Sequence, residues 1–184
     1  MPLTRETFAA VVLEDIDGRW ELHQGKLREK PQMSFAHNRL ARRLAFRIAS
    51  QLDLDRFEVL HDDGHLSVPL GSSYVPDVAV VPNELFEAFS NAPDRFESYT
   101  GSLPFVAEGW SPSTGSYDVD TKIPGYKARG DEEIWRIHPF ERTLSMARLQ
   151  PDGAYEATVV TGGTVRLHAL SEVIIDLDEM FSRE

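Results

Sequence analysis

The sequence predicts an α/β fold in which a mixed central β-sheet is flanked by helices. The strongest helix pattern is SFAHNRLARRLAFRIASQLD, because Leu40, Leu44, Ile48 and Leu52 recur there at a spacing of four residues. The segments YVPDVAVVP and FVAEGW are apolar on both faces, which is typical of central strands. Shorter strand patterns lie before and after these segments, so helices and strands alternate along the chain.

The remaining elements follow from local signals. A short helix, LTRETFAAVVLED, is expected after a cap at Thr4, and Gln24-Gly25 predicts a hairpin within GRWELHQGKLREKP. Ser34 can cap the long helix. The other predicted strands are FEVLH, HLSVPL, EEIWRIHP, TLSMARL, AYEATVV and TVRLHAL, with a short helix at ELFEAFS and a final strand or edge helix at EVIIDLDEMF.

Length and composition indicate one domain. The 184 residues are expected to form a single domain with a core at about 15–140 and a C-terminal β meander at about 141–184. The absence of cysteine excludes disulfides and thiolate zinc sites. The N-terminus lacks the apolar segment of a signal peptide, and no apolar run approaches the roughly 18 residues of a membrane helix. We therefore expect a cytoplasmic protein.

The formal net charge of -11 disfavours non-specific, charge-driven binding of nucleic acid, although a local basic groove is compatible with it. Four arginines lie within nine residues of the long helix: Arg39, Arg42, Arg43 and Arg47. They form either a solvated side of the helix with acids nearby or a set of phosphate contacts. The acidity of the chain favours the first interpretation.

Two carboxylates occupy similar positions in the apolar strand patterns. Asp77 lies in YVPDVAVV and Glu108 in FVAEGW. If the two strands are neighbours, these side chains project side by side, and one pKa rises unless a cation lies between them. Oxygen ligands without cysteine favour Mg²⁺ or Mn²⁺, which can activate water and polarise a phosphate. The alternatives are a turn aspartate after Pro76 and a buried glutamate paired with an arginine.

A third set of polar residues follows at a spacing of four, and its members are Asp118, Lys122, Tyr126 and Gly130. On a helix the first three share a face, but Pro124-Gly125 interrupts the pattern and predicts a helix start near Ile123. Lys122 can return toward Glu108 and stabilise developing negative charge, or it can be a solvated lysine. Tyr126 is more typical of packing or of an indirect hydrogen bond.

His37 and Glu21 each have two interpretations. His37 shares the inward face of the long helix, one turn from its start, and is either a core histidine or part of a site. Glu21 alternates with Trp20 and Leu22, so it is either a further acidic ligand or an exposed strand residue. We favour the exposed position for Glu21.

The ordered motifs resemble a known family. YVPDVAVVP, then FVAEGWSPST, then DVDTKIPGYKARGDEEIWRIHP look like the restriction endonuclease-like family of small bacterial proteins, within the PD-(D/E)xK nuclease superfamily. WELHQGKL and SFAHNRL resemble its N-terminal part, so the resemblance spans about residues 15 to 140. One departure is Trp110, which stands where the superfamily usually has lysine, and Lys122 looks like its replacement.

The resemblance implies a restriction endonuclease-like core and Mg²⁺-dependent (or Mn²⁺-dependent) hydrolysis of DNA. Asp77, Glu108 and the carbonyl of Gly109 would bind the metal, Lys122 would assist catalysis, and His37 would be an accessory ligand or substrate contact. Two other classes stay open: a nuclease-fold protein without turnover that binds nucleic acid or regulates, and a protein whose carboxylate pair is only structural. Edge strands and Trp135 make a homodimer plausible.

Overall fold

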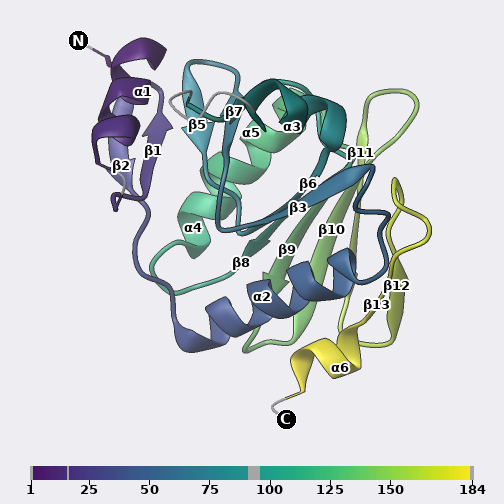
Figure 1. Cartoon of the computed structure of the whole chain (residues 1–184). Helices are drawn as coiled ribbons and strands as arrows, with labels where there is room; N and C mark the ends of the chain where they lie inside the picture. The colour runs from purple at the N-terminus through teal and green to yellow at the C-terminus, as the bar shows by residue number, and fades with distance from the viewer. Residues whose placement is uncertain (1, 16, 91–95, 183–184) are drawn as a thin grey trace.

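Figure 1 shows the computed structural model, which describes residues 2–15, 17–90 and 96–182. The helices of this part of the chain are α1 (Arg5–Glu14), α2 (Phe35–Ala49), α3 (Asn83–Ser90), α4 (Gly115–Tyr117), a π-helical turn η1 (Asp118–Lys122), α5 (Ile123–Arg129) and α6 (Leu177–Phe181). The strands are β1 (Trp20–His23), β2 (Lys26–Glu29), β3 (Phe57–His61), β4 (His65–Val68), β5 (Ser72–Tyr74), β6 (Val78–Pro82), β7 (Ser98–Tyr99), β8 (Phe105–Gly109), β9 (Glu133–His138), β10 (Thr143–Leu149), β11 (Tyr155–Val160), β12 (Thr164–Arg166) and β13 (Ile174–Asp176).

The main sheet of the described residues has six strands in the order β11-β10-β9-β8-β6-β3. Strands β8 and β9 are parallel, and the other pairs are antiparallel, so the sheet is mixed as the sequence predicts. A five-stranded sheet, β2-β1-β5-β4-β7, and the hairpin β12-β13 complete the strand pairings. The central strands β6 and β8 are buried along nearly their whole length, which confirms the inference from their apolar faces.

The two faces of the main sheet are covered by different elements. On one face, Leu44 and Ile48 of α2 pack with Phe105 and Trp135 of the sheet and with β12, β13 and α6. Figure 1 shows α2 lying across this face. On the other face, Val106 and residues of β4, β5 and α5 form a second apolar cluster. Successive strand residues alternate between the two clusters, as the pleat requires.

Local signals predict the starts of several elements correctly. The side chains of Thr4 and Ser34 cap α1 and α2 by accepting hydrogen bonds from backbone N–H groups three residues on. Gln24 and Gly25 have φ values of 48° and 75°, and they join β1 to β2 in the predicted hairpin. Left-handed conformations at both positions are typical of the two-residue turn that suits the twist of antiparallel strands.

The connection from β8 to β9 differs from the prediction. Pro124-Gly125 does not isolate the downstream helix, because α4, η1 and α5 follow one another without a break. The N–H of Ile123 donates to the carbonyl of Asp118, five residues back, so one π-helical turn precedes the proline. Asp118, Lys122 and Tyr126 nevertheless all lie on the buried side, as their spacing indicates.

The C-terminal strands adjoin the central ones. Strand β10 pairs with β9 on one side and with β11 on the other, through six residues each, so the main sheet continues past the expected boundary near residue 140. Trp135 has an exposed fraction of 0%, because it packs on Phe105 inside the core. The suggestion that Trp135 takes part in a homodimer is therefore wrong, since a side chain without exposed surface cannot contact a partner.

None of the helices in the described part of the chain combines the length and the apolar character that a membrane span requires.

Candidate functional site

The candidate site lies where β6 begins and β8 ends. Val78 pairs with Ala107 across these antiparallel strands, so the preceding Asp77 lies beside Glu108. Asp77 is not in a strand as predicted: β5 ends at Tyr74 and β6 starts at Val78, and the aspartate lies in the connection. The predicted proximity of the two carboxylates is nevertheless found, because their strands are neighbours in the sheet.

Asp77 is held by three donors. Its Oδ1 is 2.7 Å from Nζ of Lys30, and its Oδ2 is 2.6 Å from Nε2 of His37 and accepts a 2.7 Å hydrogen bond from the N–H of Gly109. Burial alone would raise the pKa of Asp77, but Lys30 and His37 outweigh it and hold that pKa well below its usual value. Asp77 is therefore an ionised carboxylate in a buried position.

Lys30, which the sequence did not single out, is as buried as the carboxylate it holds. Its Nζ donates to Asp62 Oδ1 at 2.7 Å and to the carbonyl of Val75 at 3.1 Å, in addition to Asp77. Asp62 is bound in turn by Arg19. Burial lowers the pKa of Lys30, yet the net pKa is raised, chiefly because Asp77 favours the ammonium form.

Glu108 has a different set of partners. Its Oε1 is 2.8 Å from Nζ of Lys122 and accepts a 2.6 Å hydrogen bond from the hydroxyl of Tyr126. Burial raises the pKa of Glu108 well above its usual value; Lys122 opposes this shift, and Asp77 adds to it. The two neighbouring carboxylates are thus shifted in opposite directions, a pattern that is common at sites which move protons. Tyr126 has the indirect role that was expected.

Glu21 is buried, so the expectation of an exposed strand residue is wrong. Its Oε1 accepts the N–H of Val75 at 3.0 Å and lies 3.1 Å from Nζ of Lys122. Burial lowers the pKa of Lys122, but Glu108 and Glu21 outweigh it and hold that pKa well above its ordinary value. Lys122 is therefore a charged group between two acids, and it is not a solvated lysine.

One main-chain oxygen connects the two halves of the site. The carbonyl of Val75 accepts hydrogen bonds from both lysines, at 3.1 Å from Nζ of Lys30 and 2.9 Å from Nζ of Lys122. Two ammonium groups on one oxygen repel each other, so the carboxylates around them are needed to hold both in place. We refer to Glu21, Lys30, Asp77, Glu108 and Lys122 as the acid–lysine cluster.

His37 reaches the cluster from the first turn of α2. Burial lowers the pKa of His37, but its hydrogen bond to Asp77 and the aspartate charge raise it, and the net pKa lies above the usual value. A Cβ atom at Gly109 would stand 2.8 Å from Cδ2 of His37 and 2.9 Å from its Nε2. The glycine therefore allows the imidazole to approach the end of β8.

Metal ligation has support from donor chemistry but not from a complete ligand set. Among the described residues no group of three or more His, Cys, Asp or Glu side chains is arranged to hold a metal ion. Asp77 and Glu108 supply hard oxygen donors, and their described neighbours are ammonium groups and N–H or O–H donors. Mg²⁺ is commonly held by one or two carboxylates together with substrate phosphate and water, so two acids are sufficient.

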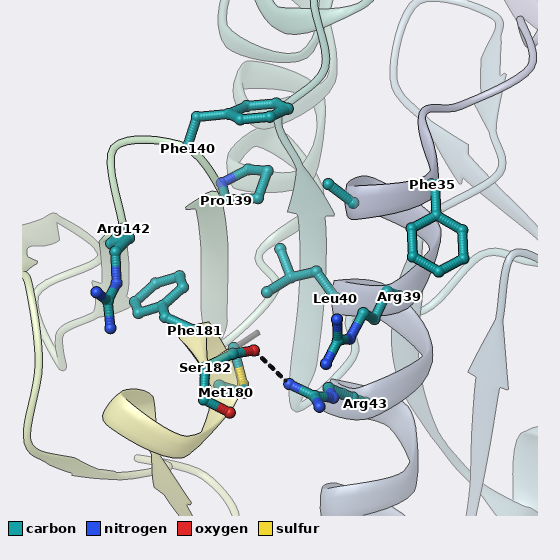
Figure 2. Close-up of a pocket in the computed structure, with 11 residues that line it drawn as sticks. Phe35, Arg39, Leu40, Arg43, Pro139, Phe140, Arg142, Met180, Phe181 and Ser182 are labelled. Atoms are coloured by element: carbon teal, nitrogen blue, oxygen red, sulfur yellow. Dashed lines mark hydrogen bonds between the residues drawn. The ribbon is translucent and has the colours of Figure 1, made fainter. Parts of the chain in front are cut away.

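Trp110 and the arginines of α2 have partners outside the cluster. Trp110 stacks on His138 with ring centroids 4.1 Å apart, and it also meets Phe140 at 6.0 Å. Arg43 donates to the carbonyl of Ser182 and Arg47 pairs with Glu179 of α6. The arginine-rich side of α2 thus has an acid nearby, as one interpretation predicted, but it also lines the cavity shown in Figure 2.

Asp118 gives a pH-dependent prediction. Burial raises its pKa to about 6, although Lys122 lowers it in part. The pKa of an aspartate in the unfolded chain is about 3.9, so the folded state holds the proton of Asp118 more tightly than the unfolded state does. The free energy of unfolding therefore falls by about 2 kcal/mol as the pH rises from 4 through 6. We expect Asp118→Asn to be more stable than the wild type in urea at pH 7.5 and to lose that advantage at pH 4.

The exposed Asp120→Asn, from the same helical turn, is the matched control for this comparison and should show no such pH dependence. An Asp118→Asn advantage of equal size at both pH values would contradict the assignment.

The geometry and the comparisons together define the class and then the family. The class is an α/β protein whose mixed sheet brings two carboxylates and two lysines together at the ends of adjacent strands. The chain belongs to the Uma2 family, described as "Putative restriction endonuclease", whose sequence pattern matches residues 5–178. The resemblance expected from the motifs is therefore confirmed.

A solved structure supports the fold. The chain is similar to a protein from Anabaena variabilis ATCC 29413 described as a "putative nuclease belonging to DUF820", with a TM-score of 0.76 over 98% of each chain. The identity is 20%, so this likeness establishes the fold alone. No curated protein matches the chain.

Proposed function

We propose that the protein is a metal-dependent endonuclease that hydrolyses phosphodiester bonds of DNA. The observation that supports this most strongly is the paired arrangement of Asp77 and Glu108 at the ends of adjacent strands, with Lys122 at 2.8 Å from Glu108. Membership of a family described as "Putative restriction endonuclease" agrees with it. The missing lysine at Trp110 is replaced by one that arrives from the helical connection between β8 and β9.

In this proposal Asp77, Glu108 and the carbonyl of Gly109 hold Mg²⁺ or Mn²⁺. The donor chemistry fits such an ion, because carboxylate and carbonyl oxygens are its preferred ligands. When bound, the metal would supply Lewis-acid stabilisation and an activated water. Lys122 stabilises negative charge on the phosphate, and His37 and Lys30 keep the carboxylate of Asp77 in position.

The test is cleavage of single- and double-stranded DNA with Mg²⁺ or Mn²⁺, together with metal binding by calorimetry. We expect Glu108→Gln and Asp77→Asn each to lower cleavage by at least about a hundredfold, because a bound metal contributes several kcal/mol to the barrier. Both variants should also bind the metal more weakly.

Glu132→Gln, at an exposed acid next to the start of β9, is the matched control and should leave both measurements unchanged. An Asp77→Asn variant with wild-type metal affinity would count decisively against the proposed ligand.

A second candidate function is a nuclease-fold module that binds nucleic acid without cleaving it. The side chains of Asp77 and Glu108 are 3% and 2% exposed, and each is already paired with a lysine. A phosphodiester reaches them only if neighbouring side chains move. DNA binding by the wild type without cleavage under any of these metals would support this candidate over the first.

A further inference from the structure

The α2–α6 groove is a cavity of about 480 Å³ between α2, the β9–β10 turn and the end of α6. Its walls are Phe35, Ala36, Arg39, Leu40 and Arg43 from α2, Pro139, Phe140 and Arg142 from the β9–β10 turn, and Met180, Phe181 and Ser182 from the C-terminal end. Figure 2 shows these side chains around the opening. Its volume lies within the range of about 300–1000 Å³ that is common for ligand sites.

The charge of the groove is opposite to that of the whole chain. Of the described residues that line the groove, three are arginines and none is an aspartate or a glutamate. The 15 residues of α2 also contain four arginines and no acid. Arg142 is exposed, and no hydrogen bond or ion pair of its side chain is found within the described residues. In a chain of net charge -11, a basic groove of this kind indicates an anionic ligand.

The rim of the groove is aromatic. Phe35 is 77% exposed and Phe140 is 62% exposed, although large apolar side chains are usually covered. Phe46, one helix turn past Arg42, is 67% exposed beside an adjoining hollow. The charged residues that line this hollow are Arg42, Arg43, Arg47 and Glu179, and Glu179 pairs with Arg47. Exposed aromatic faces alternating with arginines are typical of surfaces that bind single strands, where bases stack and phosphates pair.

The residues that line the groove do not include the acid–lysine cluster, but its rim contacts the residue that follows β8. Phe140 meets Trp110, which follows Glu108 by two residues, and Phe35 precedes His37 by two residues on α2. Double-stranded DNA keeps the faces of its bases inside its own stack and could use the arginines but not the phenylalanines.

We propose that the α2–α6 groove binds single-stranded nucleic acid, with Phe35 and Phe140 stacking on bases and Arg142 contacting phosphate. This inference rests on the proposed function, because it names the substrate class of the proposed nuclease. It predicts a preference for unpaired substrate that the family description does not contain. Binding in the groove needs no metal, so it can be measured separately from cleavage.

The experiment is fluorescence anisotropy with a labelled oligothymidine, a duplex of equal length and an abasic strand of equal length, all in EDTA. We expect the wild type to bind the oligothymidine most tightly. Phe140→Ala and Phe35→Ala should each weaken that binding about tenfold, the effect of one lost stacking contact. Arg142→Asn, which suits the left-handed backbone there (φ 53°), should lower the slope of binding against salt by about one ion.

Two exposed residues elsewhere serve as controls. Val159→Ala on β11 and Arg56→Ala before β3 remove similar groups outside the groove and should bind as the wild type does. All these positions are at the surface, so an unchanged urea midpoint confirms that each variant is folded. Equal affinity for duplex or abasic strand, no binding of the oligothymidine, or indifference to the groove variants would each overturn the proposal.

Two further measurements separate the alternatives. Polyglutamate that binds in the same way, with the same sensitivity to Phe140→Ala, would assign the groove to an acidic protein partner and overturn the proposal. Binding without cleavage by the wild type would support the groove as a binding site and contradict the proposed nuclease activity. Cleavage that does not depend on the groove residues would support the nuclease activity and contradict the groove as the binding site.

Discussion

Replacing Lys122 with methionine is expected to lower the free energy of unfolding by about 3–5 kcal/mol, the usual effect of removing one partner from a buried ion pair. The ammonium of Lys122 lies 2.8 Å from Glu108 and 3.1 Å from Glu21, and all three side chains are 2% exposed. Without it, two buried acids lose the cation between them, and each must take up a proton or draw in water. Urea unfolding at pH 7 measures the loss.

The partners of Lys122 determine how much of that loss can be recovered. Adding Glu108→Gln removes one acid, but Glu21 still lacks a cation, so Lys122→Met/Glu108→Gln should regain only part of the stability. Adding Glu21→Gln as well should regain more, and the departure from additivity measures the coupling. Lys127→Met is the matched control, because Lys127 lies in α5, which continues directly from η1, and its ammonium approaches the ring of Tyr155 at 5.4 Å. It should cost less than about 1 kcal/mol.

A loss below about 1 kcal/mol for Lys122→Met would show that the ammonium is solvated in solution, and the site described here would then be wrong in its central contact.

The parts of the fold that depend on neighbouring residues could be predicted from the sequence. The inward face of α2, its cap at Ser34 and the hairpin at Gln24-Gly25 all follow from residues within a few positions of one another. Asp77 and Glu108 could also be selected, because a carboxylate in an apolar strand pattern is unusual wherever that strand lies. Their side-by-side placement required only that β6 and β8 be neighbours.

The burial and the partners of Glu21 and Lys30 could not be predicted, because both depend on residues far away in the sequence. Glu21 is buried because β1 pairs with β5, which brings it to the N–H of Val75, 54 residues away. Lys30 reaches Asp77 across 47 residues, and in the sequence it is one of several charged residues in KLREK. Alternation within one strand predicts on which face of the sheet a side chain lies, but it does not predict which residues cover that face. The partners of both residues therefore depend on tertiary contacts.

The sequence does not predict the π-helical turn, because Pro124 indicates an interruption of the helix. Proline lacks an N–H and cannot extend a helix inward, but it is accepted in a first turn. The chain places Pro124 early in α5 and uses the wider turn η1 to continue from α4. This keeps Lys122 and Tyr126 on one buried side, so the interruption did not change the site.

Lys30→Met is expected to destabilise the protein by about 3 kcal/mol, less than Lys122→Met, because the charges around it have other partners. Asp62 keeps Arg19, and Asp77 keeps His37 and the N–H of Gly109. Adding Asp77→Asn should therefore recover most of the loss, in contrast to the partial recovery expected at Lys122. Lys26→Met, at an exposed position of β2, which ends one residue before Lys30, is the control and should be nearly neutral.

Adding millimolar Mg²⁺ tests whether Lys30 is only structural or occupies the position of a metal ion. Lys30 occupies Oδ1 of Asp77 at 2.7 Å, so its removal frees an oxygen of a proposed ligand. A ligand that binds only the folded state raises stability in proportion to its affinity. We expect Mg²⁺ to raise the urea midpoint of Lys30→Met more than that of the wild type, and the difference to vanish when Asp77→Asn is added. Equal urea midpoints of Lys30→Met with and without Mg²⁺ would mean that Asp77 binds no metal even when its ammonium partner is gone. The proposed chemistry would then have to proceed without a metal at Asp77.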